Sequence, residues 1–446
     1  MTRSPALTAA STLLTLALIG CSAAPDPGAA TTPPPGPTTD SDASEASGGH
    51  GAVAGASEAA EAQLHLVTVD AAGAVGLLDL LSGDESSLGT ITAPDRVESD
   101  GRYVFAAHEA GLEIIDSGAW TWDHGDHFHY YRGTPRLVGS VPGSGPARVV
   151  GGPLATAGGT GVFFPGSGEA VLLDNAALAA GTPDELFRVS GTPHAGLLAP
   201  LGAGAIITEA DDSGRITQLR ALAADGTPSE TTAPCPDASS ALTTRSGTVF
   251  ACADGAVLGT VDADEQAVLE RIPLSETSGA EAGAEAGAGA DAGAAGFGTA
   301  PTELAGRKGR PTVAGISAAS GSGASPGFWR LDTRARSWHW TPSAVPLLHA
   351  IAVDDAEDHV VVLDAAGSVR VFRGDTEIGA TDPLLSAAEL APEARDRITL
   401  SVDAQRAYLG AADSGVVAEI DFADGARIAR ELRPAVAPVH LTETGR

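Results

Sequence analysis

The chain has 446 residues, of which 43% are hydrophobic, and this is sufficient for one large globular domain or two. Its formal net charge of −31 would repel the phosphate backbone of a nucleic acid, so we exclude DNA and RNA as partners. A diffuse acidic surface favours solubility and attracts cations, but it does not by itself form a metal site.

Residues 1–20 predict a signal peptide for export. One basic residue, Arg3, precedes an apolar run from Ala6 to Ile19 that is too short to span a bilayer. Small residues then lead into Cys21, a pattern that resembles a bacterial lipobox, in which this cysteine becomes the lipidated first residue of the mature chain. We therefore expect an exported protein that a lipid on Cys21 anchors to the outer face of the bacterial cytoplasmic membrane.

Residues 21–60 are rich in Pro, Gly, Ser and Ala and show no apolar periodicity. Such a segment cannot bury a core, and we expect a disordered tether between the membrane and the folded domain.

From Leu64 onward one unit recurs, namely an apolar strand, a tight turn that ends in glycine, and a second alternating strand that ends near an aspartate. Seven clear copies have their turn glycines at Gly73, Gly111, Gly168, Gly214, Gly255, Gly367 and Gly415, and a weaker copy lies between Val313 and Asp332. Alternation around glycine turns predicts β-hairpins. Hairpins that recur every roughly 40 to 60 residues without long helices predict an all-β fold, a β-propeller of seven or eight four-stranded antiparallel blades over residues 61–446. We expect the first strand to complete a blade with the last.

One segment between two of these hairpins, Trp120 to Arg132, has the composition of a metal site. His124, His127 and His129 lie within six residues, in a chain that has only 11 histidines. Imidazole is a preferred ligand of zinc, and in an extended backbone His127 and His129 face the same side. An intervening glycine would let His124 join them, while Asp126 would either orient a ligating ring or coordinate the ion itself.

The histidines are surrounded by aromatic residues in a chain that is only 4% aromatic. These residues are Trp120, Trp122, Phe128, Tyr130 and Tyr131. They would wall off a site from solvent. The alternative interpretation is a solvated loop with incidental histidines beside an aromatic part of the core.

Three imidazoles leave a tetrahedral zinc ion one ligand short. Because a propeller gathers loops from several blades around one axis, we expect the fourth ligand to come from far along the chain. His194, at the start of a predicted strand, is the first candidate. His108 and His349 are further candidates, although each is also typical of a hydrogen-bonded structural histidine.

Cys235 and Cys252 are the only cysteines after Cys21. In the oxidising environment of an exported protein this pair predicts a disulfide, which would stabilise the fold by about 3 kcal/mol. The alternative, two thiolate ligands, would require both residues to stay reduced outside the cell.

Farther along, residues 275–300 are a Gly/Ala/Glu run that predicts a flexible surface insertion.

These features together resemble the AztD-type zinc metallochaperones. The resemblance rests on the motif from Asp123 to Tyr130, on Gly-Thr-Pro-His ending at His194, on the two cysteines around a hairpin, and on the ending Pro438 to Arg446. It implies an exported propeller that delivers zinc to the solute-binding protein of a zinc ABC transporter. Where the family has a histidine-rich tail, this tether offers only His50.

The resemblance implies a zinc carrier that is monomeric and not an enzyme. Two other classes of function stay open from the residues alone. Three histidines with an open fourth position would also serve a metal-dependent propeller hydrolase or lactonase. A propeller without any metal would serve as a docking module.

Overall fold

A computed structural model of the chain describes residues 55–123, 127–274, 299–317 and 326–446, all within one compact unit, Gly49–Arg446. The predicted signal peptide, Cys21, most of the tether and the insertion at 275–298 lie outside the described residues. In the described part of the chain, no helix has both the length and the apolar character needed to cross a lipid bilayer.

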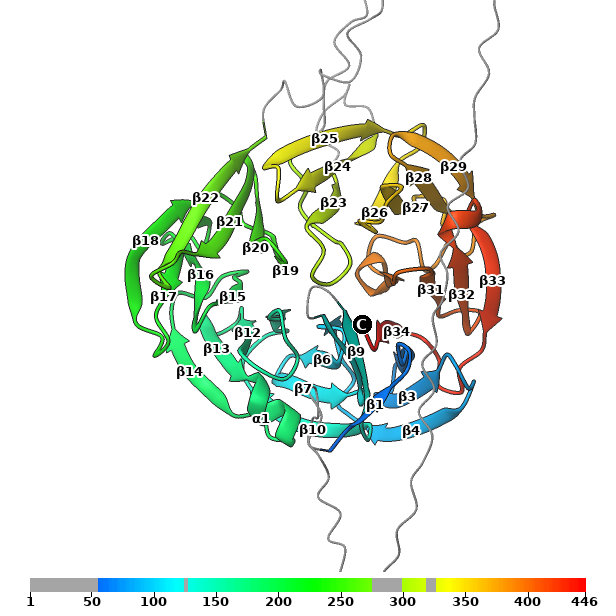
Figure 1. The fold of residues 1–446 in the computed structure, drawn as a ribbon, viewed down its shortest axis with the longest axis horizontal. Helices are drawn as coiled ribbons and strands as arrows, with labels where there is room; N and C mark the ends of the chain where they lie inside the picture. Colours follow the sequence, from blue (N-terminus) through cyan, green and yellow to red (C-terminus); the bar gives the residue numbers. More distant parts are fainter. Residues whose placement is uncertain (1–54, 124–126, 275–298, 318–325) are drawn as a thin grey trace, which may run out of the picture. The chain divides into compact units, whose positions relative to one another are not determined.

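Eight antiparallel sheets of the described residues are arranged in a ring, and the chain passes from one to the next in sequence order (Figure 1). This confirms the predicted β-propeller. Of the two predicted blade numbers, seven and eight, the structure has eight. The weak repeat at Val313–Asp332 is a real blade, with three strands rather than four in the described chain.

Blade 1 consists of β34 (His440–Thr444), β2 (His65–Val69), β3 (Ala74–Asp79) and β4 (Glu85–Thr90). Blade 2 consists of β5 (Arg96–Ser99), β6 (Tyr103–His108), β7 (Gly111–Asp116) and β10 (Arg136–Pro142). Blade 3 consists of β11 (Arg148–Val150), β12 (Gly159–Phe164), β13 (Glu169–Asp174) and β14 (Glu185–Ser190), with α1 (Asn175–Ala180) between the last two strands. Blade 4 consists of β15 (Leu198–Leu201), β16 (Gly204–Ala210), β17 (Ile216–Leu222) and β18 (Pro228–Pro234).

Blade 5 consists of β19 (Ser240–Thr244), β20 (Gly247–Cys252), β21 (Gly255–Val261) and β22 (Ala267–Pro273). Blade 6 consists of β23 (Thr312–Ile316), β24 (Gly327–Asp332) and β25 (Ser337–Pro342). Blade 7 consists of β26 (Leu347–Ala352), β27 (His359–Asp364), β28 (Val369–Arg373) and β29 (Thr376–Ala380). Blade 8 consists of β30 (Leu400–Val402), β31 (Ala407–Ala411), β32 (Val416–Asp421) and β33 (Arg427–Leu432).

The core lies between neighbouring blades. Between blades 2 and 3, for example, Phe105 and Ile114 pack with Val162 and Phe164, and none of the four is more than 1% exposed. Because the middle strands of each blade are covered on both faces, their sequences are nearly continuous apolar runs, whereas outer strands such as β10 and β22 alternate between exposed and buried residues.

The ring is closed by the two ends of the described chain. β34 pairs antiparallel with β2, and its register places His440 opposite Val69 and Thr444 opposite His65. This confirms the expectation that the first strand completes a blade with the last. The hairpins depend on their turn glycines: Gly73 has φ +86°, and a Cβ there would lie 2.1 Å from the carbonyl oxygen of Ile91.

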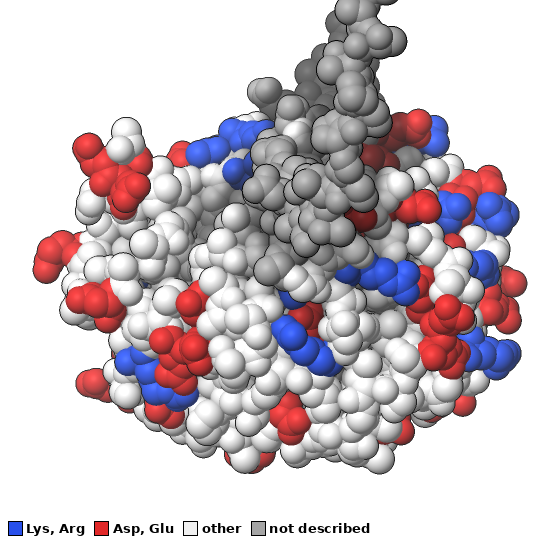
Figure 2. Space-filling model, turned by 60° about the horizontal axis from the view of Figure 1, so that its bottom comes forward, with Lys and Arg blue, Asp and Glu red and all other residues white. Residues whose placement is uncertain are grey.

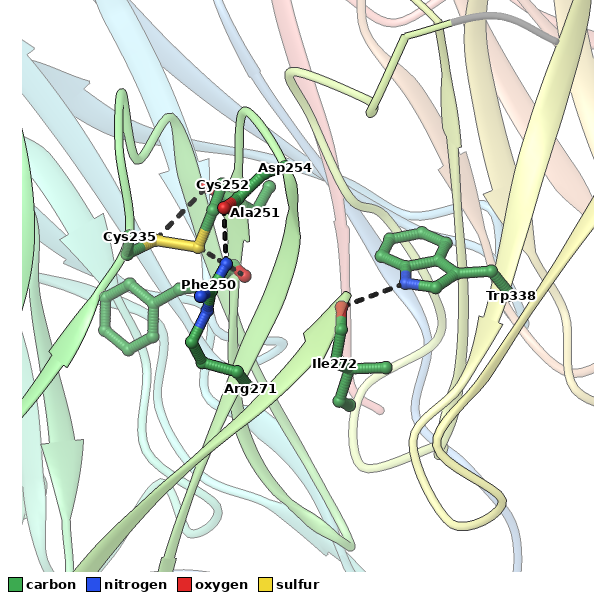
Figure 3. Close-up of a disulfide and its surroundings, with 8 residues drawn as sticks. All are labelled: Cys235, Phe250, Ala251, Cys252, Asp254, Arg271, Ile272 and Trp338. Atoms are coloured by element: carbon green, nitrogen blue, oxygen red, sulfur yellow. Dashed lines mark hydrogen bonds and ion pairs between the residues drawn. A yellow bond between two sulfur atoms is a disulfide. The ribbon is translucent and has the colours of Figure 1, made fainter. Parts of the chain in front are cut away.

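The predicted disulfide is confirmed. Cys235, just after β18, is bonded to Cys252 at the end of β20, so it joins blade 4 to blade 5 (Figure 3). Both cysteines are buried. Blades 5 and 6 are joined by a hydrogen bond, in which the indole nitrogen of Trp338 donates to the carbonyl oxygen of Ile272 at 3.2 Å (Figure 3).

Candidate metal centre

A small three-stranded sheet carries the histidine motif. The hairpin of β8 (Ala119–Asp123) and β9 (Phe128–Arg132) is inserted between β7 and β10 of blade 2. The third strand, β1 (Ser57–Ala59), pairs with β9 and places Glu58 opposite Tyr131. β1 therefore forms part of the folded structure although it lies in the segment expected to be a tether.

Aromatic packing fixes the base of this hairpin. The rings of Trp120 and Tyr131 are stacked with their centroids 5.0 Å apart, and both side chains are buried. The guanidinium of Arg102 lies 3.8 Å from the centre of the Trp120 ring and donates two hydrogen bonds, at 2.9 and 2.8 Å, to the carboxylate of Asp116. Thr121 also donates to the carbonyl oxygen of Gly445 at 2.7 Å. The base of the hairpin is thus held by blade 2 and by the C-terminal segment.

The structure brings His127 and His129 together, as the strand alternation predicts. Their Nε2 atoms are 2.9 Å apart and their ring centroids are 4.7 Å apart. His129 is 7% exposed, whereas His127 is exposed to solvent. One ring of the pair is therefore buried against the sheet and the other faces outward.

Glu58 orients the buried ring. Its Oε1 lies 2.6 Å from Nδ1 of His129, and because a carboxylate only accepts, Nδ1–H is the donor. A neutral His129 then carries its lone pair on Nε2, the atom that faces His127. A carboxylate that fixes the tautomer of a histidine in this way is typical of metal sites, where it also makes the ring a stronger ligand.

The sequence offered no signal for Glu58, which is one acid among several in a segment with no apolar pattern. Its charge also affects its neighbour: burial, and next the carboxylate of Glu58, raise the pKa of the Tyr131 hydroxyl. Tyr131 therefore stays neutral at physiological pH and contributes a packing surface beside the two histidines.

An ion pair connects the far end of β8 to blade 5. Asp123 contacts the guanidinium of Arg245, which lies on the turn between β19 and β20. Residues 124–126, which include the predicted ligands His124 and Asp126, lie outside the described residues. Within the described ranges, no three side chains of His, Cys, Asp or Glu are grouped so that they could share one metal ion.

His194 contacts residues of blades 3 and 4 and its own loop. Its Nδ1 is 2.6 Å from the carbonyl oxygen of Thr192, its Nε2 is 2.9 Å from the hydroxyl of Thr208, and its ring meets Phe163 edge-on with centroids 4.7 Å apart. Both ring nitrogens thus have a partner. For His194 to act as the fourth ligand, which stays a prediction, it would have to give up the Thr208 hydrogen bond.

His108 and His349 each lie near a carboxylate. Nε2 of His108 is 3.7 Å from Glu113, which lies on the adjacent strand. Nδ1 of His349 is 3.6 Å from Glu303, and both residues line a cavity of about 250 Å³ between the inner strands of blades 2, 6, 7 and 8. Nδ1 of His108 also accepts the backbone N–H of Ala110 at 3.3 Å, within its own hairpin. A role of either histidine as the fourth ligand stays a prediction.

No protein-family model matches the chain, and no curated protein matches its sequence. Its fold is similar to that of two structures of AztD from Citrobacter koseri. The first is 18% identical, with a TM-score of 0.68, over 86% of this chain and 98% of that chain. The second, of apo AztD, is 17% identical, with a TM-score of 0.67 over the same shares. In its fold, the chain is a β-propeller of the AztD type.

Proposed function

We propose that this protein is an extracytoplasmic zinc metallochaperone, which captures zinc through the β8–β9 hairpin and passes it by ligand exchange to the solute-binding protein of a zinc ABC transporter. The observation that supports this proposal is the arrangement of His127, His129 and Glu58. One imidazole has its tautomer fixed by a carboxylate, and its Nε2 faces the Nε2 of a second imidazole.

The difference in exposure between the two rings suits a carrier. His129 is buried and oriented, so it would hold the ion, while the exposed His127 is the ligand that an incoming protein would replace first. Each replacement keeps the coordination number constant, so zinc never has to leave as a free ion. The remaining ligands proposed from the sequence are His124, Asp126 and His194.

The rigid base of the hairpin supports the same role. Trp120 is clamped between Tyr131 and the guanidinium of Arg102, so the position of His129 relative to the blades is fixed before zinc arrives. Preorganised ligands lose less conformational freedom on binding. A lipid anchor on Cys21, if processed as the sequence predicts, would raise the effective concentration of the carrier at a membrane transporter.

The proposal is tested by zinc titration of the full chain against a chromophoric chelator, followed by transfer to a zinc-free solute-binding protein while a second chelator traps any free ion. His127→Ala and His129→Ala should each lower both affinity and transfer. His339→Ala is the matched control, because its Nε2 is paired with Asp375 at 2.7 Å away from the hairpin. Unchanged zinc affinity in both hairpin variants would refute the proposal, and zinc-dependent turnover of esters or lactones would favour the hydrolase.

A further inference from the structure

The chain contains 26 basic residues but only one lysine, Lys308. It lies on the segment before β23, which reaches toward the centre of the ring, where the C-terminus also lies (Figure 1). A Cβ built on Gly101 would be 3.3 Å from Cδ of Lys308 and 3.2 Å from Cγ of Arg446. The aliphatic parts of the two basic side chains therefore both contact the turn between β5 and β6.

Lys308 has no counterion in this position. Within the described part of the chain it makes no hydrogen bond and no ion pair, although many of the arginines pair with carboxylates, as Arg102 does with Asp116. Burial lowers the pKa of Lys308; nearby Asp100 opposes this shift, and Arg446 and Arg102 add to it. Burial, then Arg310 and Arg446, also lower the pKa of Arg307, while Asp403 and Asp354 oppose this shift. Several cations therefore lie close enough to Lys308 to repel one another.

Two of the nearby carboxylates, Glu443 and Asp100, compensate these cations only in part. Glu443 is fully buried and lies 2.9 Å from Nε of Arg446, but burial raises its pKa to about 8, so it is largely protonated at neutral pH. Oδ1 of Asp100 accepts hydrogen bonds from the backbone N–H groups of Arg102 and Tyr103 at 2.9 and 2.7 Å. This carboxylate oxygen therefore stabilises the turn between β5 and β6 rather than pairing with Lys308.

An unused donor lies at the same place. Arg102 is 4% exposed and, among the described residues, its Nη1 has no hydrogen-bond partner, although its Nε and Nη2 donate to Asp116. A buried guanidinium nitrogen without a partner is costly unless a ligand or ordered water completes it. Lys308, Arg307 and Arg446 are half-buried, so the cluster can be reached from solvent.

We propose that Lys308, Arg446 and Arg102 form a binding site for a small, multiply charged oxyanion, with Arg307 at its edge. Guanidinium and ammonium groups are the donors that proteins use for phosphate and carboxylate groups. A polymer such as a nucleic acid does not fit, because the remainder of the chain is strongly acidic and the donors are partly enclosed. On the face shown in Figure 2, basic side chains occur in small groups among acidic ones.

Binding is tested with inorganic phosphate, and in a separate arm with malonate, on the full chain after metal removal and dialysis. Either oxyanion should raise the melting temperature in a saturable way, and chloride at the same ionic strength should not. Lys308→Met should weaken binding by about tenfold or more, since it removes a hydrogen bond between charged groups. The variant should fold at least as well as the wild type, because it no longer places a charge without a counterion in a partly buried position. Arg433→Gln is the control, since Arg433 is exposed and forms no ion pair with any described residue.

A chemical label gives a second readout that does not depend on folding. Because the chain has one lysine, acylation followed by peptide mass spectrometry reports on Lys308 alone, apart from any free N-terminal amine, which lies on a different peptide. Phosphate or malonate should slow this acylation. The proposal is overturned if neither ion protects Lys308, if chloride protects it equally, or if Lys308→Met binds both ions as the wild type does; the cluster would then hold water only.

Discussion

Replacing Glu58 with glutamine tests the geometry of the proposed zinc site most directly. The substitution keeps the shape of the side chain and the backbone pairing of β1 with β9, but it removes the charge that holds Nδ1–H of His129. Loss of a carboxylate behind a ligating histidine lowers metal affinity by about 10- to 100-fold. Since 49% of the Glu58 side chain is exposed, water would replace part of the interaction, and we expect the lower end of this range, about tenfold or about 1.4 kcal/mol.

The assay is a zinc competition titration at constant pH, with a thermal melt of the same samples to confirm that the fold is intact. Glu61→Gln is the matched control, because Glu61 is an exposed acid three residues farther along the same segment. A tenfold loss for Glu58→Gln and none for Glu61→Gln would support the geometry. Equal affinities for the two variants would show that Glu58 does not orient a ligand, and the role assigned to the pair of histidines would need another basis.

Three further predictions concern the hairpin, the disulfide and the buried end of β34. Zinc affinity should be lower at acidic pH, because protons compete with zinc for imidazole nitrogens, and this dependence should weaken when His127 and His129 are both alanine; a competition titration between pH 5 and 8 measures it. Replacing both Cys235 and Cys252 with serine should lower the free energy of unfolding by about 3 kcal/mol, measured by urea denaturation, whereas an unchanged midpoint would show that the disulfide contributes no stability. Burial raises the pKa of Glu443 to about 8, so the folded state binds a proton that the unfolded state releases near pH 4.5, and stability should decline as pH rises between these values. Glu443→Gln should flatten that decline in urea denaturation between pH 5 and 9, and an unchanged slope would contradict the assignment.

Local patterns were sufficient wherever one segment decides its own structure. Apolar runs around turn glycines predicted the central hairpins of the blades, because a strand covered on both faces must be apolar and a tight turn must accept positive φ. The same alternation placed His127 and His129 on one side of their strand. The pairing of Cys235 with Cys252 needed only their number and the oxidising compartment.

The remainder depended on which distant segments meet when the ring closes. Glu58 reaches His129 only because β1 joins the β8–β9 hairpin, and Lys308 meets Arg446 only because the segment before β23 and the C-terminus both turn toward the centre. His194 had the sequence context of a ligand, yet its ring nitrogens are taken up by Thr192 and Thr208.

The sequence by itself therefore determined the type of fold, the hairpins, the disulfide and the residues from which a metal site would be built. Only the tertiary structure decided the number of blades, the carboxylate that orients His129 and the cluster of basic side chains around Lys308. The physical reason is that strand periodicity and turn chemistry are short-range, whereas the closure of eight blades brings together side chains from opposite ends of the chain whose proximity no local pattern encodes.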